Sequence, residues 1–195
     1  MSKKTTNLEF PELGLLQKEL KRERYKRRFR RLLRSTVNAL IVVAAVAALI
    51  ATLVLPVLQI AGTSMEPSLN DGDIVLLMKT SRLETGDLCA FYYSNKILIK
   101  RVIATPGDYI WINDDGTVVL NGDELDEPYL TDKSLGECDV AFPYQVPENS
   151  YFMMGDHRET SIDSRSSVIG CIAEDQLLGK IIFKIWPLSE FEFMG

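Results

Sequence analysis

An uncharged, apolar stretch between Val37 and Ile60 is the feature that most limits how this chain of 195 residues can fold. Its clearly polar residues are Asn38, Thr52 and Gln59. A helix over Ala39–Leu58 would contain 20 residues and measure about 30 Å at ~1.5 Å per residue, the thickness of the hydrocarbon core of a bilayer. The sequence therefore predicts one N-terminal transmembrane helix, in an anchor over residues 37–60.

Two other interpretations of this stretch stay open. A cleaved signal peptide would have a short charged region and an apolar region of about 7–15 residues, and both regions are longer here. A helix buried in the core of a soluble protein is the second alternative. The uncleaved anchor fits the length of both regions best.

Charge is divided unevenly along the chain. Residues 1–36 contain twelve Lys or Arg and four Glu, whereas residues 37–195 contain ten Lys or Arg and twenty-three Asp or Glu. Just after the span, residues 61–69 carry Glu66 as their only charge. Because positively charged flanks stay in the cytoplasm, we expect a cytoplasmic basic tail over residues 1–36. Residues 61–195 would then be the extracytoplasmic domain of a single-pass protein in the cell membrane.

The basic run before the span holds ten Lys or Arg between positions 18 and 34, and we expect it to contact anionic lipid headgroups. A nucleic-acid partner is the alternative for such a run, but Tyr25 and Phe29 are its only interleaved aromatic residues. Membrane lipid, and not nucleic acid, is therefore the expected partner.

Three cysteines, Cys89, Cys138 and Cys171, leave at least one thiol without an intramolecular partner. A disulfide between two of them is chemically allowed outside the cytoplasm, and the sequence does not select a pairing. Because His157 is the only histidine and no CxxC pair occurs, we expect no metal site.

The region after residue 60 has the pattern of an all-β, β-rich domain. Short runs rich in β-branched and aromatic residues alternate with turn residues, and no long helical period occurs there. Asp115-Gly116 and Asn121-Gly122 are dipeptides typical of hairpin turns. The predicted strands are Ile74–Met78, Leu88–Tyr93, Ile97–Ile103, Tyr109–Ile112, Thr117–Leu120, Tyr151–Met154 and Gly179–Trp186.

Residues 121–147 are expected to form an irregular surface excursion from this domain, because they are rich in Asp, Glu, Pro and Gly. An acidic cluster lies within the excursion, but it lacks the spacing of a calcium-binding loop. We therefore predict a solvated loop at Asp123, Glu124, Asp126 and Glu127.

Three segments combine side chains that can support chemistry. Ser64 follows the apolar stretch directly, in a turn-like Gly-Thr-Ser-Met-Glu-Pro sequence. Lys100 interrupts a strongly apolar predicted strand, on the same face as Leu98 and Val102. Residues 155–165 place several hydrogen-bonding side chains after another apolar strand. Each segment alone has a structural explanation: a turn serine, a lysine whose amine reaches solvent, and an ion-paired loop.

Together these segments suggest nucleophilic catalysis by a serine with a lysine as its base. A hydroxyl needs a base to become a nucleophile, and a neutral lysine amine can take its proton. Lowering the pKa of a lysine from ~10.4 to roughly 7–8 requires about 4 kcal/mol, which burial among apolar residues can supply. A second hydroxyl, such as that of Ser161, could orient the amine. Spacing alone does not bring the three residues together.

Four short stretches of the chain are Ser64–Leu69, Gly72–Val75, Lys100–Asp108 and Gly155–Arg165. They resemble the sequence boxes of bacterial type I signal peptidases, the leader peptidase family with a Ser/Lys dyad. They occur in the order found in that family, and the likeness extends over residues 57–187. The resemblance also fits the predicted anchor, because that family is tethered with its catalytic domain outside the cytoplasmic membrane.

The resemblance implies that Ser64 is the nucleophile and that Lys100 is the general base, which later protonates the leaving amine. Ser161 would orient Lys100. The oxyanion would be bound by the backbone N–H of Ser64 and by a donor two residues earlier. Some relatives have a serine hydroxyl at that place, but this chain has Gly62, so a backbone N–H is expected to serve.

The resemblance also implies how a substrate would bind. The predicted strand around Leu98 would pair with the extended backbone of the substrate by β-addition. Small apolar pockets would accept small side chains at the first and third positions before the cut, and Met65 with Pro67 would shape the turn that presents Ser64. The residues expected to contact substrate are Ile60, Met65, Leu69, Ile97, Leu98 and Ile99.

Four charged residues are expected to form structural ion pairs that hold the site, and no metal or cofactor is needed. They are Arg101, Asp156, Asp163 and Arg165. Lysine at position 100 points to the bacterial branch of the family, because the eukaryotic and archaeal relatives use histidine there.

Two positions depart from the family pattern. His157 stands where Asn is common, and Ala104 stands where Gly is common. His157 opens a Ser/His/Asp alternative with Ser64 as the nucleophile, although Lys100 stands where the family keeps its base. We therefore expect His157 to be a hydrogen-bonded structural residue.

The sequence thus predicts a membrane-bound serine endopeptidase that removes signal peptides from exported preproteins, with a functional link to the secretion translocon. The site is expected near the membrane surface, because Ser64 follows the span by only a few residues. Three rival hypotheses remain. A Ser/Lys peptidase of the self-cleaving repressor type would not need the anchor, and a peptidase dedicated to pilin-like or other special substrates would share every motif. A single-pass binding protein would not explain the serine and the lysine.

Overall fold

The computed structural model describes residues 13–195 except 55 and 81, and the side chains of residues 13–16 and 50–54 are not described either. The first twelve residues of the predicted tail and residue 55 of the predicted span therefore lie outside the described residues. The chain divides into two compact units, one up to Ala51 and one from Thr52 onward.

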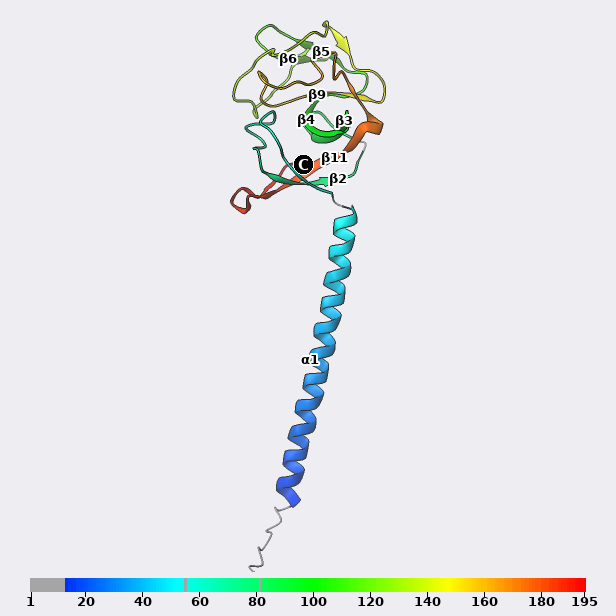
Figure 1. The fold of residues 1–195 in the computed structure, drawn as a ribbon, viewed down its shortest axis with the longest axis vertical. Coiled ribbons are helices and arrows are strands. Elements are labelled where there is room, and N and C mark those ends of the chain that lie inside the picture. Colours follow the sequence, from blue (N-terminus) through cyan, green and yellow to red (C-terminus); the bar gives the residue numbers. More distant parts are fainter. Residues whose placement is uncertain (1–12, 55, 81) are drawn as a thin grey trace, which may run out of the picture. The chain divides into compact units, whose positions relative to one another are not determined.

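One long helix, α1 (Leu13–Val54, 42 residues), fills the described part of the first unit (Figure 1). At ~1.5 Å per residue it is about 63 Å long, roughly twice the thickness of a hydrocarbon core. By length and composition, its segment Gln17–Leu49 is apolar enough to cross a membrane. Apolar side chains such as Leu40, Ile41 and Val43 are more than half exposed. The predicted N-terminal apolar helix is confirmed.

The bounds of α1 differ from the prediction at both ends. It begins before the apolar stretch, because residues 15–55 contain no Gly or Pro and the basic run is built largely from strong helix formers. It ends at Val54, because Pro56 has no N–H to donate and its ring clashes with the preceding turn. The prediction of helix as far as Leu58 was wrong: Val57–Gln59 form a strand, β1.

The second unit is β-rich, as predicted. Seven of its strands match the predicted runs, and β2, β3 and β5 have the predicted bounds. The further strands in the described residues are two or three residues long, and two single-turn 3-10 helices, η1 and η2, lie near the C-terminus. The elements are β1 (Val57–Gln59), β2 (Ile74–Met78), β3 (Leu88–Tyr93), β4 (Lys96–Ala104), β5 (Tyr109–Ile112), β6 (Val118–Leu120), β7 (Asp123–Glu124), β8 (Tyr144–Gln145), β9 (Ser150–Met154), β10 (Ile172–Ala173), η1 (Glu174–Gln176), β11 (Leu177–Trp186), η2 (Leu188–Glu190) and β12 (Glu192–Phe193).

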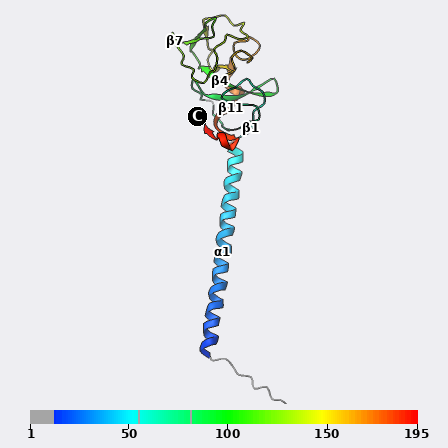
Figure 2. The same cartoon turned by 90° about the vertical axis from the view of Figure 1, so that its left-hand side faces the viewer.

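These strands form two antiparallel sheets. The larger sheet has the order β1-β2-β11-β3-β4-β9-β10, with β12 beside β11, and the smaller has the order β7-β6-β5-β8. Figure 1 shows β5 and β6 beyond β9, and Figure 2 shows β7 at the same end of the unit, away from β11 and β1. The smaller sheet therefore lies at one end of the unit, and the larger sheet carries the rest.

Apolar side chains bury both faces of the larger sheet. In β3, Leu88 and Ala90 belong to one buried cluster, whereas Cys89 and Phe91 belong to another, as the alternation of side chains along a strand requires. A third cluster joins β9 to β5 and so attaches the smaller sheet. The structure contains no disulfide among the three cysteines, all of which are described and free.

Both predicted hairpin dipeptides form turns between antiparallel strands. Asp115-Gly116 lies between β5 and β6, and Asn121-Gly122 lies between β6 and β7. Asn121 and Gly122 have φ angles of 54° and 100°, and the two-residue turns that suit hairpins need such positive values.

The excursion over residues 121–147 is only partly the solvated loop that we predicted. It is irregular between β7 and β8, and Asp123, Glu124 and Asp126 are exposed. Glu127, however, is 7% exposed and forms an ion pair with the buried Arg158. The prediction was therefore wrong for Glu127, because a buried cation elsewhere in the fold draws this carboxylate inward.

Alanine substitutions at two turn glycines test the close packing of the excursion against the smaller sheet. Gly116 and Gly122 have φ angles of 86° and 100°, where a side chain costs about 1 kcal/mol. A Cβ at Gly122 would meet no atom within 4 Å, whereas a Cβ at Gly116 would lie 2.7 Å from Ser134 Cα. Gly122→Ala should lower the free energy of unfolding by about 1 kcal/mol and Gly116→Ala by about 2–4 kcal/mol, measured by urea denaturation. Equal losses would contradict the close approach of Ser134.

Candidate active site

The turn that carries Ser64 is held by two buried apolar residues. Within it, the Glu66 N–H donates to Thr63 O at 3.1 Å and the Leu69 N–H donates to Met65 O at 2.9 Å. Met65 and Leu69 are 2% and 0% exposed and belong to the buried cluster that includes residues of β2 and β3. The half-buried Ser64 is thereby attached to the core on one side and faces a cavity on the other.

Lys100 reaches this turn from β4. Its Nζ lies 2.8 Å from Ser64 Oγ, and the residue is 4% exposed. Directly opposite, in β3, lies the fully buried Cys89, and burial raises the pKa of that thiol to about 12. Burial disfavours the charged form of Lys100 too, and for an amine this lowers the pKa, here to about 8. The negative charge of Asp163 acts in the opposite direction, because it favours the charged amine. A neutral amine at hydrogen-bond distance can accept the proton of a serine hydroxyl.

The loop that follows β9, residues 155–165, contacts the backbone of the nucleophile candidate. The His157 N–H donates to Ser64 O at 3.1 Å. A Cβ on Gly155 would collide with Ser161 Oγ and with Ser64 O. Glycine is therefore required at this position, because a side chain would push the loop away from the turn.

Ser161 lies beside this contact but forms no hydrogen bond with Lys100 in the structure. It is 1% exposed, and its Oγ has no hydrogen-bond partner among the described residues. The predicted orienting bond is thus not present in this arrangement. A buried hydroxyl without a partner is costly, so this group has a strong tendency to take a partner when one comes within reach.

Two buried arginine–aspartate pairs connect the segments of the site. Arg101 donates from Nε and Nη2 to Asp156 at 2.8 and 2.6 Å, and Arg165 donates from Nε and Nη2 to Asp163 at 2.8 Å each. Bidentate pairs of this kind fix orientation as well as distance. The structure therefore brings together the four charged residues expected to form structural ion pairs.

The Gly62 N–H is already engaged, contrary to its expected role as an oxyanion donor. It donates to Asp71 Oδ1 at 2.8 Å. An amide has one hydrogen, so this bond would have to break before the group could bind an oxyanion. The Ser64 N–H, in contrast, donates no hydrogen bond within the described part of the chain.

A cavity of ≈ 200 Å³ adjoins Ser64 and Lys100, between residues 58–62 and β4. Five of the six residues expected to contact substrate line it. Leu69 does not, because it is completely buried beneath the turn, so its prediction as a pocket residue was wrong. The five lining residues are Ile60, Met65, Ile97, Leu98 and Ile99.

The backbone of β4 has a free edge beside this cavity. On one side, β3 pairs with β4 from Lys96 to Arg101. On the other side, β9 pairs with it only from Arg101 to Ala104. Residues 96–100 therefore have no strand partner on that edge within the described chain, and an extended peptide could be added there.

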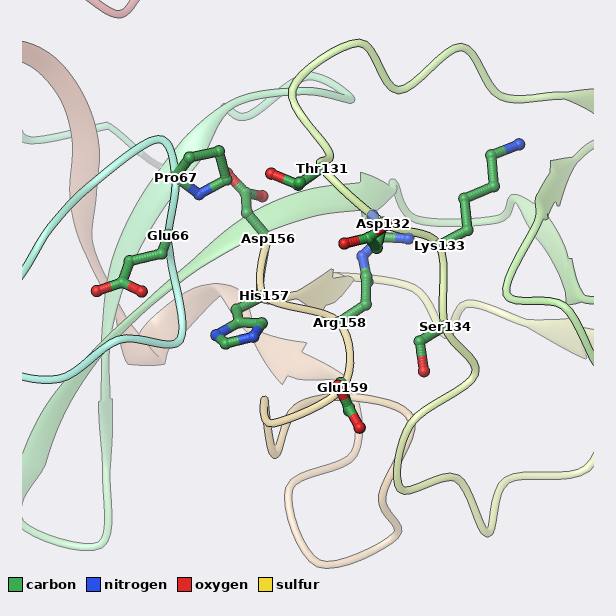
Figure 3. Close-up of a pocket in the computed structure, with 10 residues that line it drawn as sticks. All are labelled: Glu66, Pro67, Thr131, Asp132, Lys133, Ser134, Asp156, His157, Arg158 and Glu159. Atoms are coloured by element: carbon green, nitrogen blue, oxygen red, sulfur yellow. The ribbon is translucent and has the colours of Figure 1, made fainter.

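A larger cavity of ≈ 560 Å³ borders the same turn. Glu66 and Pro67 of the Ser64 turn, residues 131–134 of the excursion and residues 156–159 line it. Figure 3 shows the loop residues between the turn and the excursion. The turn, the loop and the excursion thus meet around one space. No cluster of His, Cys, Asp and Glu side chains that could hold a metal ion occurs among the described residues.

His157 does not have the hydrogen-bonded side chain that we expected. Its Nδ1 is buried and finds no hydrogen-bond partner in the described structure. No hydrogen bond between its ring and Ser64 Oγ is present in that part of the chain, so the geometry does not favour a Ser/His/Asp site. The contact to Ser64 is made by its backbone instead.

Several contacts of the site were not foreseen from the sequence. Arg101 Nη2 donates to Ser68 Oγ at 3.0 Å, and the guanidinium carbon of Arg101 lies 3.8 Å from the centre of the Tyr129 ring. Arg158 pairs with Glu127. Nothing in the pattern around Glu127 or Tyr129 distinguishes them from other residues of an acidic loop, because their partners are distant in sequence.

Comparisons with known proteins show the family of this chain. The model of the family described as signal peptidase, peptidase S26, matches residues 33–186. Signal peptidase IB of Staphylococcus aureus (strain MRSA252) is 39% identical over 154 residues, 69% of this chain and 79% of the relative. Signal peptidase I of Bacillus licheniformis is 35% identical over 144 residues, 67% of this chain and 76% of the relative.

A crystal structure of a signal peptidase I from Enterococcus faecalis V583 is also similar. It shares 28% sequence identity and covers 51% of this chain and 96% of its own, with a TM-score of 0.42. The family assignment depends on the match over residues 33–186, which includes the Ser64 turn, β4 and the loop after β9. The chain belongs to the signal peptidase family, peptidase S26.

Proposed function

We propose that this protein is a membrane-bound serine endopeptidase that removes N-terminal signal peptides from exported preproteins with Ser64 and Lys100. The observation that carries the proposal is the 2.8 Å separation of Lys100 Nζ and Ser64 Oγ, with the amine buried. Membership of the signal peptidase family supplies the substrate class.

The reaction begins with the neutral form of Lys100. The Ser64 hydroxyl gives its proton to Nζ while Oγ attacks the carbonyl carbon of the scissile bond. The free Ser64 N–H is the donor available to the developing oxyanion. The Lys100 ammonium then protonates the leaving amine, which releases the mature chain. Water, deprotonated by the same amine, hydrolyses the acyl-enzyme.

Ser161 has the role of orienting Lys100 during this cycle. In support of this role, its hydroxyl is buried beside Gly155, close to the Ser64 backbone, and has no hydrogen-bond partner among the described residues. The arginine–aspartate pairs hold the surrounding backbone and take no proton.

The signal peptide binds as an added strand on the free edge of β4. That edge supplies main-chain donors and acceptors beside the cavity lined by Ile60, Ile97 and Ile99. Because the cavity is only ≈ 200 Å³ and has these isoleucines in its wall, it suits the small side chains before the cut.

Helix α1 anchors the enzyme in the cell membrane with its basic end in the cytoplasm, which places residues 61–195 outside. The apolar segment of α1 and the excess of Lys and Arg before residue 37 support this topology. Anionic lipid is then a partner of the basic segment, and the secretion translocon is a functional partner that supplies preproteins.

Substitution of either member of the dyad tests the proposal. Ser64→Ala and Lys100→Ala should each lower the cleavage rate of a preprotein at least about 10³-fold, because the nucleophile or its base is lost. The exposed residues Ser189 and Lys79 provide matched controls, and Ser189→Ala and Lys79→Ala should leave the rate unchanged. The measurement is release of mature chain by detergent-solubilised, full-length protein. Cleavage at the wild-type rate by both dyad variants would show that the proposed chemistry is wrong.

The pH dependence of cleavage provides a second test. Lysine is neutral above its pKa, and burial lowers the pKa of Lys100 to about 8. The value of kcat/KM should therefore rise with pH, with a midpoint near 8, and at pH 6 it should be about 100-fold below its plateau. Initial rates between pH 5.5 and 9.5 would show this limb. A rate that falls as pH rises from 6 to 8 would contradict a lysine base.

A further inference from the structure

The excursion reaches the site through one aromatic ring. The guanidinium of Arg101 lies over the face of Tyr129, with 3.8 Å between the guanidinium carbon and the ring centre. Tyr129 is largely buried, and its hydroxyl donates to Glu127 Oε1 at 2.7 Å. The ring is thus fixed at its hydroxyl end while its face covers the side chain that follows Lys100.

Arg101 is the residue on which the three parts of the site converge. It belongs to β4 and comes immediately after Lys100. Its guanidinium binds Asp156 of the loop after β9 through two hydrogen bonds and Ser68 of the nucleophile turn through a third. A displacement of Arg101 would therefore change the position of β4, the loop and the turn relative to one another.

Glu127 makes a second connection from the excursion to the loop. Besides accepting from Tyr129, it forms a bidentate ion pair with Arg158, which is 1% exposed. Arg158 Nε in turn donates to Gly155 O at 3.1 Å. Gly155 is the residue packed against Ser64 O and Ser161 Oγ. The path from the Glu127 carboxylate to the nucleophile's backbone therefore passes through two residues, Arg158 and Gly155.

We propose that Tyr129 and Glu127 are positioning residues, which hold Arg101 and the loop after β9 so that Lys100 and Ser64 keep their hydrogen-bond distance. The proposal rests on the function proposed above. The excursion is accordingly part of the machinery that orients the dyad, and Tyr129 also shields its surroundings from water.

Loss of this shield has an effect that a change in global stability alone would not have. Lys100 faces Asp163, Arg165 and Asp156, and its pKa is low chiefly because the amine is buried. Displacement of Arg101 also separates the guanidinium from Asp156, whose negative charge favours the ammonium form of Lys100. The pKa of Lys100 should then rise towards its ordinary value, and the acid limb of the pH profile should move to higher pH.

The test compares variants of the full-length protein in preprotein cleavage, with kcat, KM and the pH profile measured on folded protein. Tyr129→Leu should lower kcat about 10- to 100-fold with KM changed less than about threefold, because the substrate edge of β4 is untouched. Its pH midpoint should rise. Tyr129→Phe keeps the ring over Arg101 and should retain kcat within about threefold. Glu127→Gln, which keeps the shape but removes the charge that pairs with Arg158, should lower kcat about tenfold.

Tyr109 provides the matched control, because it is an exposed tyrosine of the smaller sheet, and Tyr109→Leu should leave kcat and the pH midpoint unchanged. Wild-type kcat and pH midpoint in folded Tyr129→Leu and Glu127→Gln would overturn the inference, even if their melting temperatures fall. If Tyr129→Leu does not fold, Glu127→Gln decides in the same way. Ser64→Ala is assayed in parallel: if it stays active, the proposed function fails, whereas its inactivity beside unaffected positioning variants rejects this inference alone.

Discussion

A primary amine held out of water beside a hydroxyl is the arrangement on which the rest of this site depends. Burial disfavours the ammonium form of Lys100, but two carboxylates nearby, Asp163 and Asp156, favour it. Each of these carboxylates is bound by a buried arginine through two hydrogen bonds. The positive charge of Arg165 also disfavours the ammonium form of Lys100, and desolvation is the largest effect.

The same arginine–aspartate pairs also hold together segments of the site that are distant in sequence. The Ser64 turn, β4 and the loop after β9 are far apart in sequence, and backbone pairing joins β4 to β9 only from Arg101 onward. Side chains have to position the parts that the sheet does not hold. Arg101 connects β4 to the Ser64 turn through Ser68. Gly155 lets the loop after β9 contact Ser64 O, and Tyr129 of the excursion covers the guanidinium of Arg101.

Much of the fold could be predicted because apolar residues in the longer strands and the helix form runs or regular patterns in the sequence. The predicted bounds of β2, β3 and β5 match the structure. In β2 and β5 buried residues alternate with more exposed ones, and in β3 four consecutive residues are buried. Strands of two residues, such as β7 and β10, have no period to detect and arise from pairing with neighbours. The helix was predicted too far towards its C-terminal end because hydropathy does not distinguish an apolar strand from a membrane segment at Val57–Gln59.

The candidate site was predictable to the extent that its residue types carry chemistry. A turn serine, a lysine in an apolar strand and the family boxes indicated Ser64 and Lys100, which the structure brings within hydrogen-bond distance. The engagement of the Gly62 N–H by Asp71, the burial of Leu69 and the inward Glu127 depend on contacts between distant residues. No local pattern encodes such contacts.

The place where β9 joins β4 has a consequence for where a bound chain can be cut. On the edge of β4 away from β3, residues 96–100 have no strand partner among the described residues, and β9 pairs with β4 from Arg101 onward. A peptide strand that pairs with this edge must end where β9 begins, next to Lys100. If the signal peptide adds to this edge as proposed, its register on β4 determines which of its peptide bonds lies beside Lys100.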